Sequence, residues 1–256
     1  MYFDTHCHLN SEEMFENRKA FIEKAREADV QTFCVVGYNL ISSQRAVQIA
    51  HEYKDVYAVV GIGPEDCLET DEKELQLLEA LLKDEKVVAL GEIGLDYHWD
   101  TVPKEKQMTI FKAQLALAQR YQLPVVIHSR DALKDTYDIL KEAKAHGVMH
   151  CYSGSAQMAL DFIEIGFMIS LAGPVTFKNA RVPKEVALKV PLDSLLIETD
   201  SPYLTPHPFR GKPNDSSYVP LVAKEIARIK GIDEKLVAKQ TTQNAYRIFN
   251  IGQERV

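Results

Sequence analysis

Short apolar runs alternate with amphipathic helical stretches along the whole chain, and this alternation limits the folds that the chain can adopt. Eight runs predict strands: Tyr2–Thr5, Thr32–Gly37, Val56–Gly61, Val87–Gly91, Pro124–His128, Gly147–His150, Phe167–Leu171 and Ser194–Thr199. Most of these runs are almost entirely apolar, as is typical of parallel strands that helices cover. Between them apolar residues recur every three or four positions, which predicts helices, and a last helix is expected over Asp233–Phe249.

Eight strands with helices between them favour a closed (β/α)₈ barrel, the TIM-barrel fold of the α/β class. An open, doubly wound sheet is the alternative, but no glycine-rich phosphate-binding loop follows an early strand. The chain has 256 residues, which matches the roughly 250 residues of one such barrel. Because no stretch has the composition of a linker, we expect residues 1–256 to form a single domain.

The composition excludes several classes of protein. No apolar run approaches the roughly 18 residues that span a bilayer, and the N-terminus lacks the pattern of a signal peptide, so we expect a cytoplasmic protein without membrane contact. The four cysteines form no C-x-x-C pair, which argues against a disulfide framework or a cysteine zinc site. The net charge of −7 argues against a protein that coats nucleic acid. Nothing in the sequence indicates an obligate protein partner.

Ionisable side chains stand at the carboxyl ends of five predicted strands. They are His6, His8, Glu92, His128, His150 and Asp200. In a parallel barrel these ends share one face, where the loops build active sites. His6 and His8 are two residues apart, so both imidazoles point to the same face, while Cys7 between them should face the helices as a packing residue.

Four histidines and two carboxylates suit divalent ions such as zinc or manganese and are too rich in nitrogen for a calcium site. One tetrahedral catalytic ion uses about three protein ligands and a water. Six ligands therefore fit two ions that share one bridging carboxylate, an arrangement used in phosphoester hydrolysis.

Five stretches around these residues carry a resemblance to a known family. They are Phe3–Leu9 (FDTHCHL), Gly91–Tyr97 (GEIGLDY), Pro124–Arg130 (PVVIHSR), His150–Gly154 (HCYSG) and Leu196–Pro202 (LIETDSP). In this order, and over essentially the whole chain, they resemble the TatD family of metal-dependent deoxyribonucleases among the amidohydrolase-like barrels.

The resemblance implies that His6, His8 and Asp200 hold one ion and that His128 and His150 hold the other, with Glu92 between them. It also implies hydrolysis of DNA phosphodiester bonds from strand ends or in single-stranded stretches, supported by Mg²⁺, Mn²⁺ or Zn²⁺. In this interpretation, water activated by the two ions attacks phosphorus, and Asp200 orients that water and accepts its proton, so Asp200 and Glu92 are the expected catalytic residues.

Other residues near the motifs are expected to contact substrate or ligands. The expected substrate contacts are Arg130, Tyr152, Ser201, Arg210 and Lys212. Four aromatic residues of the same loops could stack on unpaired bases or pack in the core or at its rim: Tyr97, Trp99, Tyr152 and Tyr203. We expect Glu198 to hydrogen-bond a ligand histidine, whereas Asp96 could equally cap its own loop.

The sequence departs from the family pattern at two loops. Gly63 stands where the family usually has the histidine of a His-Pro pair, and Pro213 begins a stretch that is usually Arg-Asn-Glu-Pro. Both departures concern substrate contact and leave the metal ligands intact. Two alternatives stay open: an amidohydrolase-type enzyme for another small ester, amide or phosphoester, and a non-catalytic metal-binding scaffold.

Overall fold

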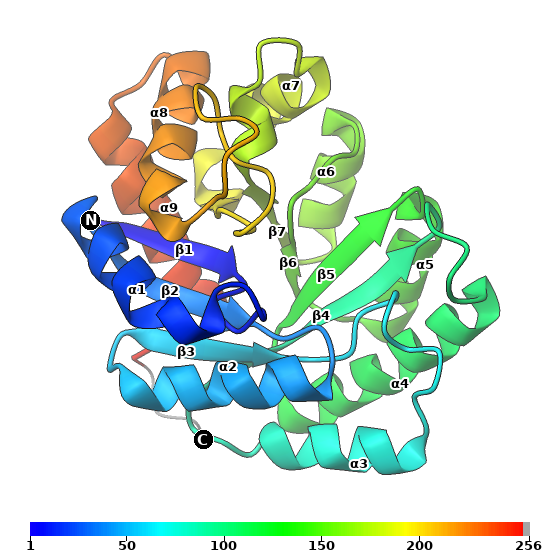
Figure 1. The fold of residues 1–256 in the computed structure, drawn as a ribbon. Coiled ribbons are helices and arrows are strands. Elements are labelled where there is room, and N and C mark those ends of the chain that lie inside the picture. The colour runs from blue at the N-terminus through cyan, green and yellow to red at the C-terminus, as the bar shows by residue number, and fades with distance from the viewer. Residues whose placement is uncertain (253–256) are drawn as a thin grey trace.

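The structure is a computed structural model that describes residues 1–252, and it confirms the predicted barrel (Figure 1). Eight parallel strands pair in the order in which they occur along the chain. They are β1 (Tyr2–Cys7), β2 (Val30–Val36), β3 (Val56–Val60), β4 (Val87–Asp96), β5 (Val125–Arg130), β6 (Gly147–Met149), β7 (Phe167–Leu171) and β8 (Leu195–Ile197). The strands β1, β4 and β5 extend past their predicted ends. His6 and Glu92 therefore lie inside strands rather than just after them, and His128 lies within its strand rather than at the end of it.

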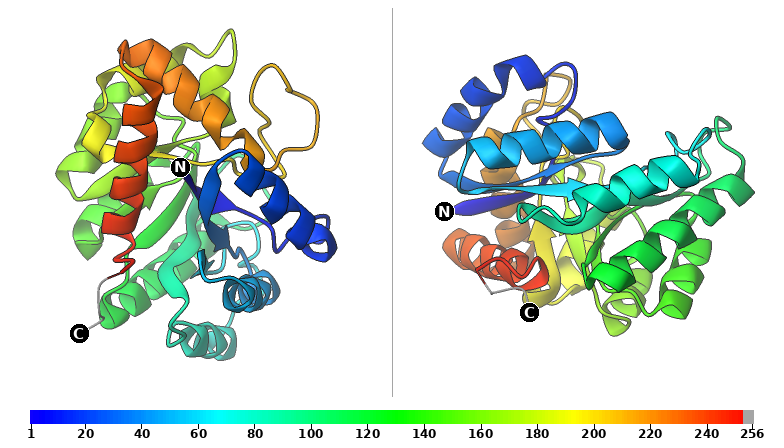
Figure 2. Two further views of the ribbon diagram at one scale, coloured as in Figure 1. Left: turned by 90° about the vertical axis from the view of Figure 1, so that its left-hand side faces the viewer. Right: turned by 90° about the horizontal axis from the view of Figure 1, so that it is seen from below.

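Helices surround the strands on the outside of the barrel (Figure 2). The α-helices are α1 (Arg18–Glu27), α2 (Leu40–Glu52), α3 (Glu72–Leu81), α4 (Lys104–Tyr121), α5 (Leu133–Ala143), α6 (Ala156–Glu164), α7 (Arg181–Lys189), α8 (Val219–Lys230) and α9 (Glu234–Ile248). Four short 3₁₀ helices accompany them: η1 (Phe15–Asn17), η2 (Gly173–Thr176), η3 (Leu192–Ser194) and η4 (Ser216–Tyr218). Within residues 1–252, every helix is too short or too polar to cross a membrane.

Two apolar clusters hold the barrel together. The larger one lies between the strands and the helices, and the smaller one fills the barrel interior. In the smaller cluster, Phe3 of β1 contacts the rings of Tyr246 and Phe249, with ring centroids 5.6 and 6.3 Å apart. The C-terminal helix α9 and the residue that follows it therefore pack against the apolar interior of the barrel, and the polar residues of the interior collect at the carboxyl ends of the strands.

One extra residue in β1 turns His6 of this strand, and His8 just after it, into the barrel. Strict alternation would put Thr5 and Cys7 on one face and His6 and His8 on the other. Between Asp4 and Cys7, however, β1 advances three residues while β2 advances two, which is a β-bulge. Thr5 therefore faces inward along with His6 and His8, while Cys7 packs in the outer apolar cluster, as predicted.

A second bulge positions the central carboxylate. Between Leu90 and Ile93, β4 advances three residues while β5 advances two. Glu92 lies within this irregular step, and its side chain points into the barrel, where it meets histidines from β1 and β5. Bulges of this kind commonly re-aim side chains beside active sites.

The barrel closes where β1 meets the residues after β8. Cys7 and Ser201 form a parallel bridge, and the His8 amide donates to the Ser201 carbonyl at 2.9 Å. The Asp200 amide donates to the His6 carbonyl, also at 2.9 Å. The same hydrogen bonds that close the barrel therefore fix Asp200 relative to His6 and His8.

Candidate metal centre

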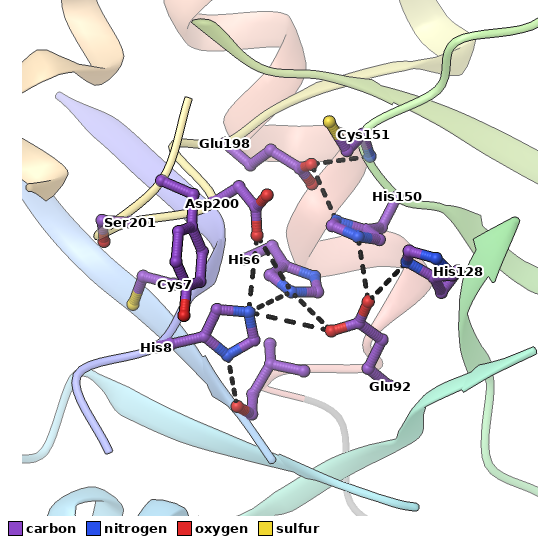
Figure 3. Close-up of polar contacts among 12 residues, drawn as sticks. His6, Cys7, His8, Glu92, His128, His150, Cys151, Glu198, Asp200 and Ser201 are labelled. Atoms are coloured by element: carbon purple, nitrogen blue, oxygen red, sulfur yellow. Dashed lines mark hydrogen bonds and ion pairs between the residues drawn. The ribbon is translucent and has the colours of Figure 1, made fainter. Parts of the chain in front are cut away.

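The structure brings together all six side chains predicted as metal ligands, with Glu92 in the middle (Figure 3). One carboxylate oxygen of Glu92, Oε2, lies 3.4 Å from Nε2 of His6 and 3.7 Å from Nε2 of His8. The other, Oε1, lies 2.9 Å from Nδ1 of His128 and 3.2 Å from Nε2 of His150. Each oxygen thus faces a different pair of histidines, which is the geometry of a bridging carboxylate.

We call the group on the Oε2 side the first donor set: His6, His8, Asp200 and Glu92 Oε2. Nε2 of His6 lies 3.2 Å from Nε2 of His8 and 3.8 Å from Oδ1 of Asp200, which is 3.4 Å from Nε2 of His8. Four ligands at about 2.0–2.1 Å from an ion form a tetrahedron with edges of about 3.4 Å. The five distances given for the first donor set range from 3.2 to 3.8 Å, close to this edge length, so these side chains could hold one divalent ion.

The second donor set comprises His128, His150 and Glu92 Oε1, and its ligand atoms lie within 4.8 Å of one another. Nε2 of His128 lies 2.8 Å from the carboxylate of Asp96, and Nδ1 of His150 lies 3.0 Å from that of Glu198. Since a carboxylate accepts hydrogen bonds, these outer nitrogens carry the protons. A cation that displaces the proton between either ring and Glu92 would then meet a neutral imidazole whose inner nitrogen offers a lone pair.

His8 of the first donor set is oriented in the same way. Its Nδ1 lies 2.8 Å from the Val36 carbonyl oxygen, which only accepts, so Nδ1 is the protonated nitrogen and Nε2 presents a lone pair. Lone pairs of histidines and carboxylates that converge on one space repel each other unless positive charge lies between them. This arrangement fits divalent cations in both donor sets.

The electrostatics of the centre also favour bound positive charge. Burial lowers the pKa of His128, but hydrogen bonds to Asp96 and Glu92 outweigh it and raise this pKa to about 9. Burial opposes ionisation of Glu92, yet the surrounding histidines hold its pKa well below the usual range. Asp200 is buried too, and its hydrogen bond with His8 lowers its pKa. Both carboxylates are therefore anionic at neutral pH.

A cavity of about 750 Å³ leads from the carboxyl face of the barrel to the metal centre. Its walls come from several loops and include Tyr38, Glu65, Asp66, Trp99 and Arg130. The cavity is large enough for a substrate of nucleotide size.

The comparisons with known proteins agree with this geometry. The model of the TatD-related DNase family matches residues 3–250. The chain belongs to this family. It is 47% identical to the uncharacterized metal-dependent hydrolase YabD of Bacillus subtilis (strain 168), over 98% of this chain and all of YabD. It is 36% identical to the uncharacterized metal-dependent hydrolase YcfH of Escherichia coli (strain K12), over 99% of this chain and 97% of YcfH.

Among solved structures, the fold matches that of YjjV, a TatD homologue from Escherichia coli K12, with a TM-score of 0.94 and 32% identity over 98% of both chains. This TatD-family protein is therefore a metal-dependent hydrolase. The donor sets on either side of Glu92 are the residues that could hold its metal.

Three of the expected substrate contacts lie close to the metal centre of this TatD-family protein, but only Arg130 lines the cavity. Tyr152 is buried, and its hydroxyl donates to the Ser155 carbonyl at 2.9 Å. Ser201 is 0% exposed. The side chains of Tyr152 and Ser201 are therefore buried and do not line the cavity, which leaves Arg130 as the expected contact that does.

Arg210 and Lys212 lie on the exposed loop between β8 and α8 and are not among the residues that line the cavity. The guanidinium of Arg210 lies 4.4 Å from the centre of the Phe177 ring, and Nζ of Lys212 lies 5.7 Å from that of Phe209. Both cations therefore pack on aromatic rings away from the metal centre.

Two carboxylates contact ligand histidines, and the sequence predicted one of these contacts more clearly than the other. Glu198 was expected to contact a ligand histidine, and the structure confirms it through His150. Asp96 fills both roles that the sequence allows, because its carboxylate contacts His128 and also accepts from the His98 amide of its own loop. Its position at the end of a strand that carries a ligand was the available signal.

Glu65 and Asp66 line the cavity, and sequence reasoning missed both. Gly63, beside them, also lines it, and a Cβ atom at this position would meet no atom closer than 3.4 Å. Sterics therefore do not require glycine here, and its effect is a wider cavity next to two acidic residues.

Proposed function

We propose that this protein hydrolyses phosphodiester bonds of DNA, working inward from strand ends, with one divalent ion in each donor set. The observation that carries the proposal is the position of Glu92, whose two oxygens face two separate groups of histidines. Two ions bridged in this way are an arrangement that suits phosphoester hydrolysis. The family's description as DNases supports DNA as the substrate.

Bound divalent ions would neutralise the phosphate oxygens and lower the pKa of water so that hydroxide is available near neutral pH. Asp200 lies at the cavity and is anionic at neutral pH, so it can orient the attacking water and accept its proton. Arg130 lines the same cavity and can donate hydrogen bonds to a phosphate oxygen. Glu92 holds the two donor sets at a fixed separation.

A specific observation favours a second candidate, a small ester, amide or phosphoester with a single anionic group. Arg130 is the only lysine or arginine among the described residues that line the cavity, while Glu65 and Asp66 add negative charge. A long polyanion gains little attraction from such walls.

One assay separates the two candidates. End-labelled single-stranded and double-stranded DNA, a phosphotriester and a lactam are each incubated with protein treated with EDTA and then with Mg²⁺, Mn²⁺ or Zn²⁺ restored. We expect metal-dependent release of nucleotides from DNA ends, and the label position gives the polarity. Hydrolysis of the small substrates with none of DNA would select the second candidate, and activity that persists in EDTA would contradict both.

A further inference from the structure

The cavity walls offer little charge with which to hold a nucleic acid strand. Arg130 is the sole Lys or Arg side chain on them within residues 1–252, and Glu65 and Asp66 oppose a second phosphate. If the proposed function is correct, another interaction must keep the strand in place. Two exposed aromatic rings line the same cavity: the side chain of Trp99 is 48% exposed and that of Tyr203 is 61% exposed.

Tyr203 stands beside the first donor set. Its backbone amide donates to the Asp200 carbonyl at 2.9 Å, and its carbonyl accepts from the side-chain amide of Asn214. The ring packs against the edge of His8, with ring centroids 6.4 Å apart. The backbone of Tyr203 is therefore fixed next to the ligands while much of its ring is open to the cavity.

Trp99 stands on the side of the second donor set, in the loop between β4 and α4. The amide of His98 donates to Asp96 at 2.9 Å, and Asp96 is the carboxylate that orients His128. The ring of His98 packs edge-on against the Trp99 ring at 4.6 Å, and the Arg130 guanidinium lies 5.5 Å from the centre of that ring. Trp99 is thus tied to the second donor set, with one cation beside it.

We infer that Trp99 and Tyr203 stack on the bases of two nucleotides that flank the scissile phosphate, so that the substrate is an unpaired strand end. His8 and His128 lie on opposite sides of Glu92 (Figure 3). Tyr203 packs on His8, and Trp99 follows His98, whose amide donates to the carboxylate that contacts His128. The two rings are therefore tied to opposite sides of the centre where the phosphate would lie. Every base has an aromatic face, so stacking holds a strand without selecting its sequence. Paired bases inside a duplex have no free face, so the strand must be frayed or single-stranded.

This inference rests on the proposed function, and a direct binding signal tests it. Trp99 is the only tryptophan in the chain, so intrinsic tryptophan fluorescence reports on this one ring. Metal-loaded protein is titrated with a short single-stranded oligonucleotide whose linkages are phosphorothioates, which slow hydrolysis. We expect quenching by this oligonucleotide and no quenching by the same backbone carrying abasic residues. Equal signals from the two ligands, or no signal from either, would overturn the inference.

Variants separate stacking from a structural role. Removing one stacked base contact should raise the dissociation constant about 5- to 150-fold, so we expect that loss for Tyr203→Ala and Trp99→Ala, the latter measured by calorimetry. Trp99→Phe should retain most of the affinity. Tyr121→Ala, which removes a partly exposed tyrosine at the C-terminal end of α4, should change nothing. Unchanged affinity in both alanine variants would refute the stacking role.

The two proposals can fail separately. If the wild-type protein releases nucleotides equally fast from normal and abasic ends, DNA hydrolysis stands and stacking is wrong. If it cleaves no DNA at all, the proposed function is wrong, and the fluorescence titration still decides whether the rings bind bases.

Discussion

Glu198 acts on the second donor set through His150, and its replacement by glutamine isolates that effect. The carboxylate of Glu198 accepts from Nδ1 of His150 at 3.0 Å, from the Cys151 amide at 2.7 Å and from the Ser170 hydroxyl at 2.6 Å. In Glu198→Gln, the remaining carbonyl oxygen can keep the first two bonds, and the new amide can donate to Ser170. The variant thus keeps the shape and the hydrogen bonds of the Glu198 side chain, and it loses only the negative charge next to His150.

The loss of such an outer partner weakens metal binding about 10- to 100-fold, which corresponds to about 1.4–2.7 kcal/mol. We expect this weakening for one of the two ions only, because His150 belongs to the second donor set. Isothermal calorimetry with a competing chelator measures both affinities, and Glu79→Gln, a surface change at the Arg120 pair, is the control. Less than a twofold change, or an equal loss at both ions, would refute the reasoning.

Three further predictions concern catalysis, pH and stability. Asp200→Asn should lower the turnover number about 10²- to 10⁴-fold by removing the proton acceptor, with an unchanged unfolding midpoint; near-normal turnover would exclude this role. Divalent ions must displace a proton from His128, whose pKa is raised to about 9. The apparent metal affinity should therefore fall about tenfold per pH unit below 9 if one proton is displaced, and a pH-independent affinity in calorimetry from pH 6 to 9 would contradict this. Gln114→Ala removes the side chain that hydrogen-bonds both the amide and the carbonyl of Ile62, each at 2.9 Å. The free energy of unfolding in urea should fall by about 2–5 kcal/mol. The control Gln119→Ala, at an exposed position, should lower it by less than about 0.5 kcal/mol, and equal effects of the two variants would argue against a stabilising role for the Gln114–Ile62 hydrogen bonds.

The barrel and the convergence of the six candidate ligands could be predicted because both depend on short-range patterns. Apolar runs with helical stretches between them define parallel strands, and residues at the ends of such strands meet on one face. Glu92 and His150 are far apart in sequence, but each directly follows an apolar run. The order of the strands in the barrel is therefore enough to predict that these two side chains lie close together.

The bulges could not be predicted, although the site depends on them. Alternation along β1 relates His6 to His8 but places Thr5 on the opposite face, and only the pairing register with β2 shows that all three point inward. Register is a property of two strands, and a single run of residues does not contain it.

The substrate contacts were the least predictable part. Proximity in sequence suggested Tyr152 and Ser201, but a residue next to a ligand on a strand or turn points away from the site as often as toward it. The acidic residues Glu65 and Asp66 come from a loop without any ligand, and the departure at Gly63 was the only sign in the sequence that this loop concerns substrate contact. Their place on the cavity wall is a consequence of how the loop after β3 folds back.

The most direct test of the central claim is an anomalous diffraction map of crystals soaked in Mn²⁺ or Zn²⁺. We expect two peaks, one among His6, His8 and Asp200 and the other between His128 and His150, each within bonding distance of a different oxygen of Glu92. A single peak at saturating metal, or two peaks of which neither contacts Glu92, would contradict the claim.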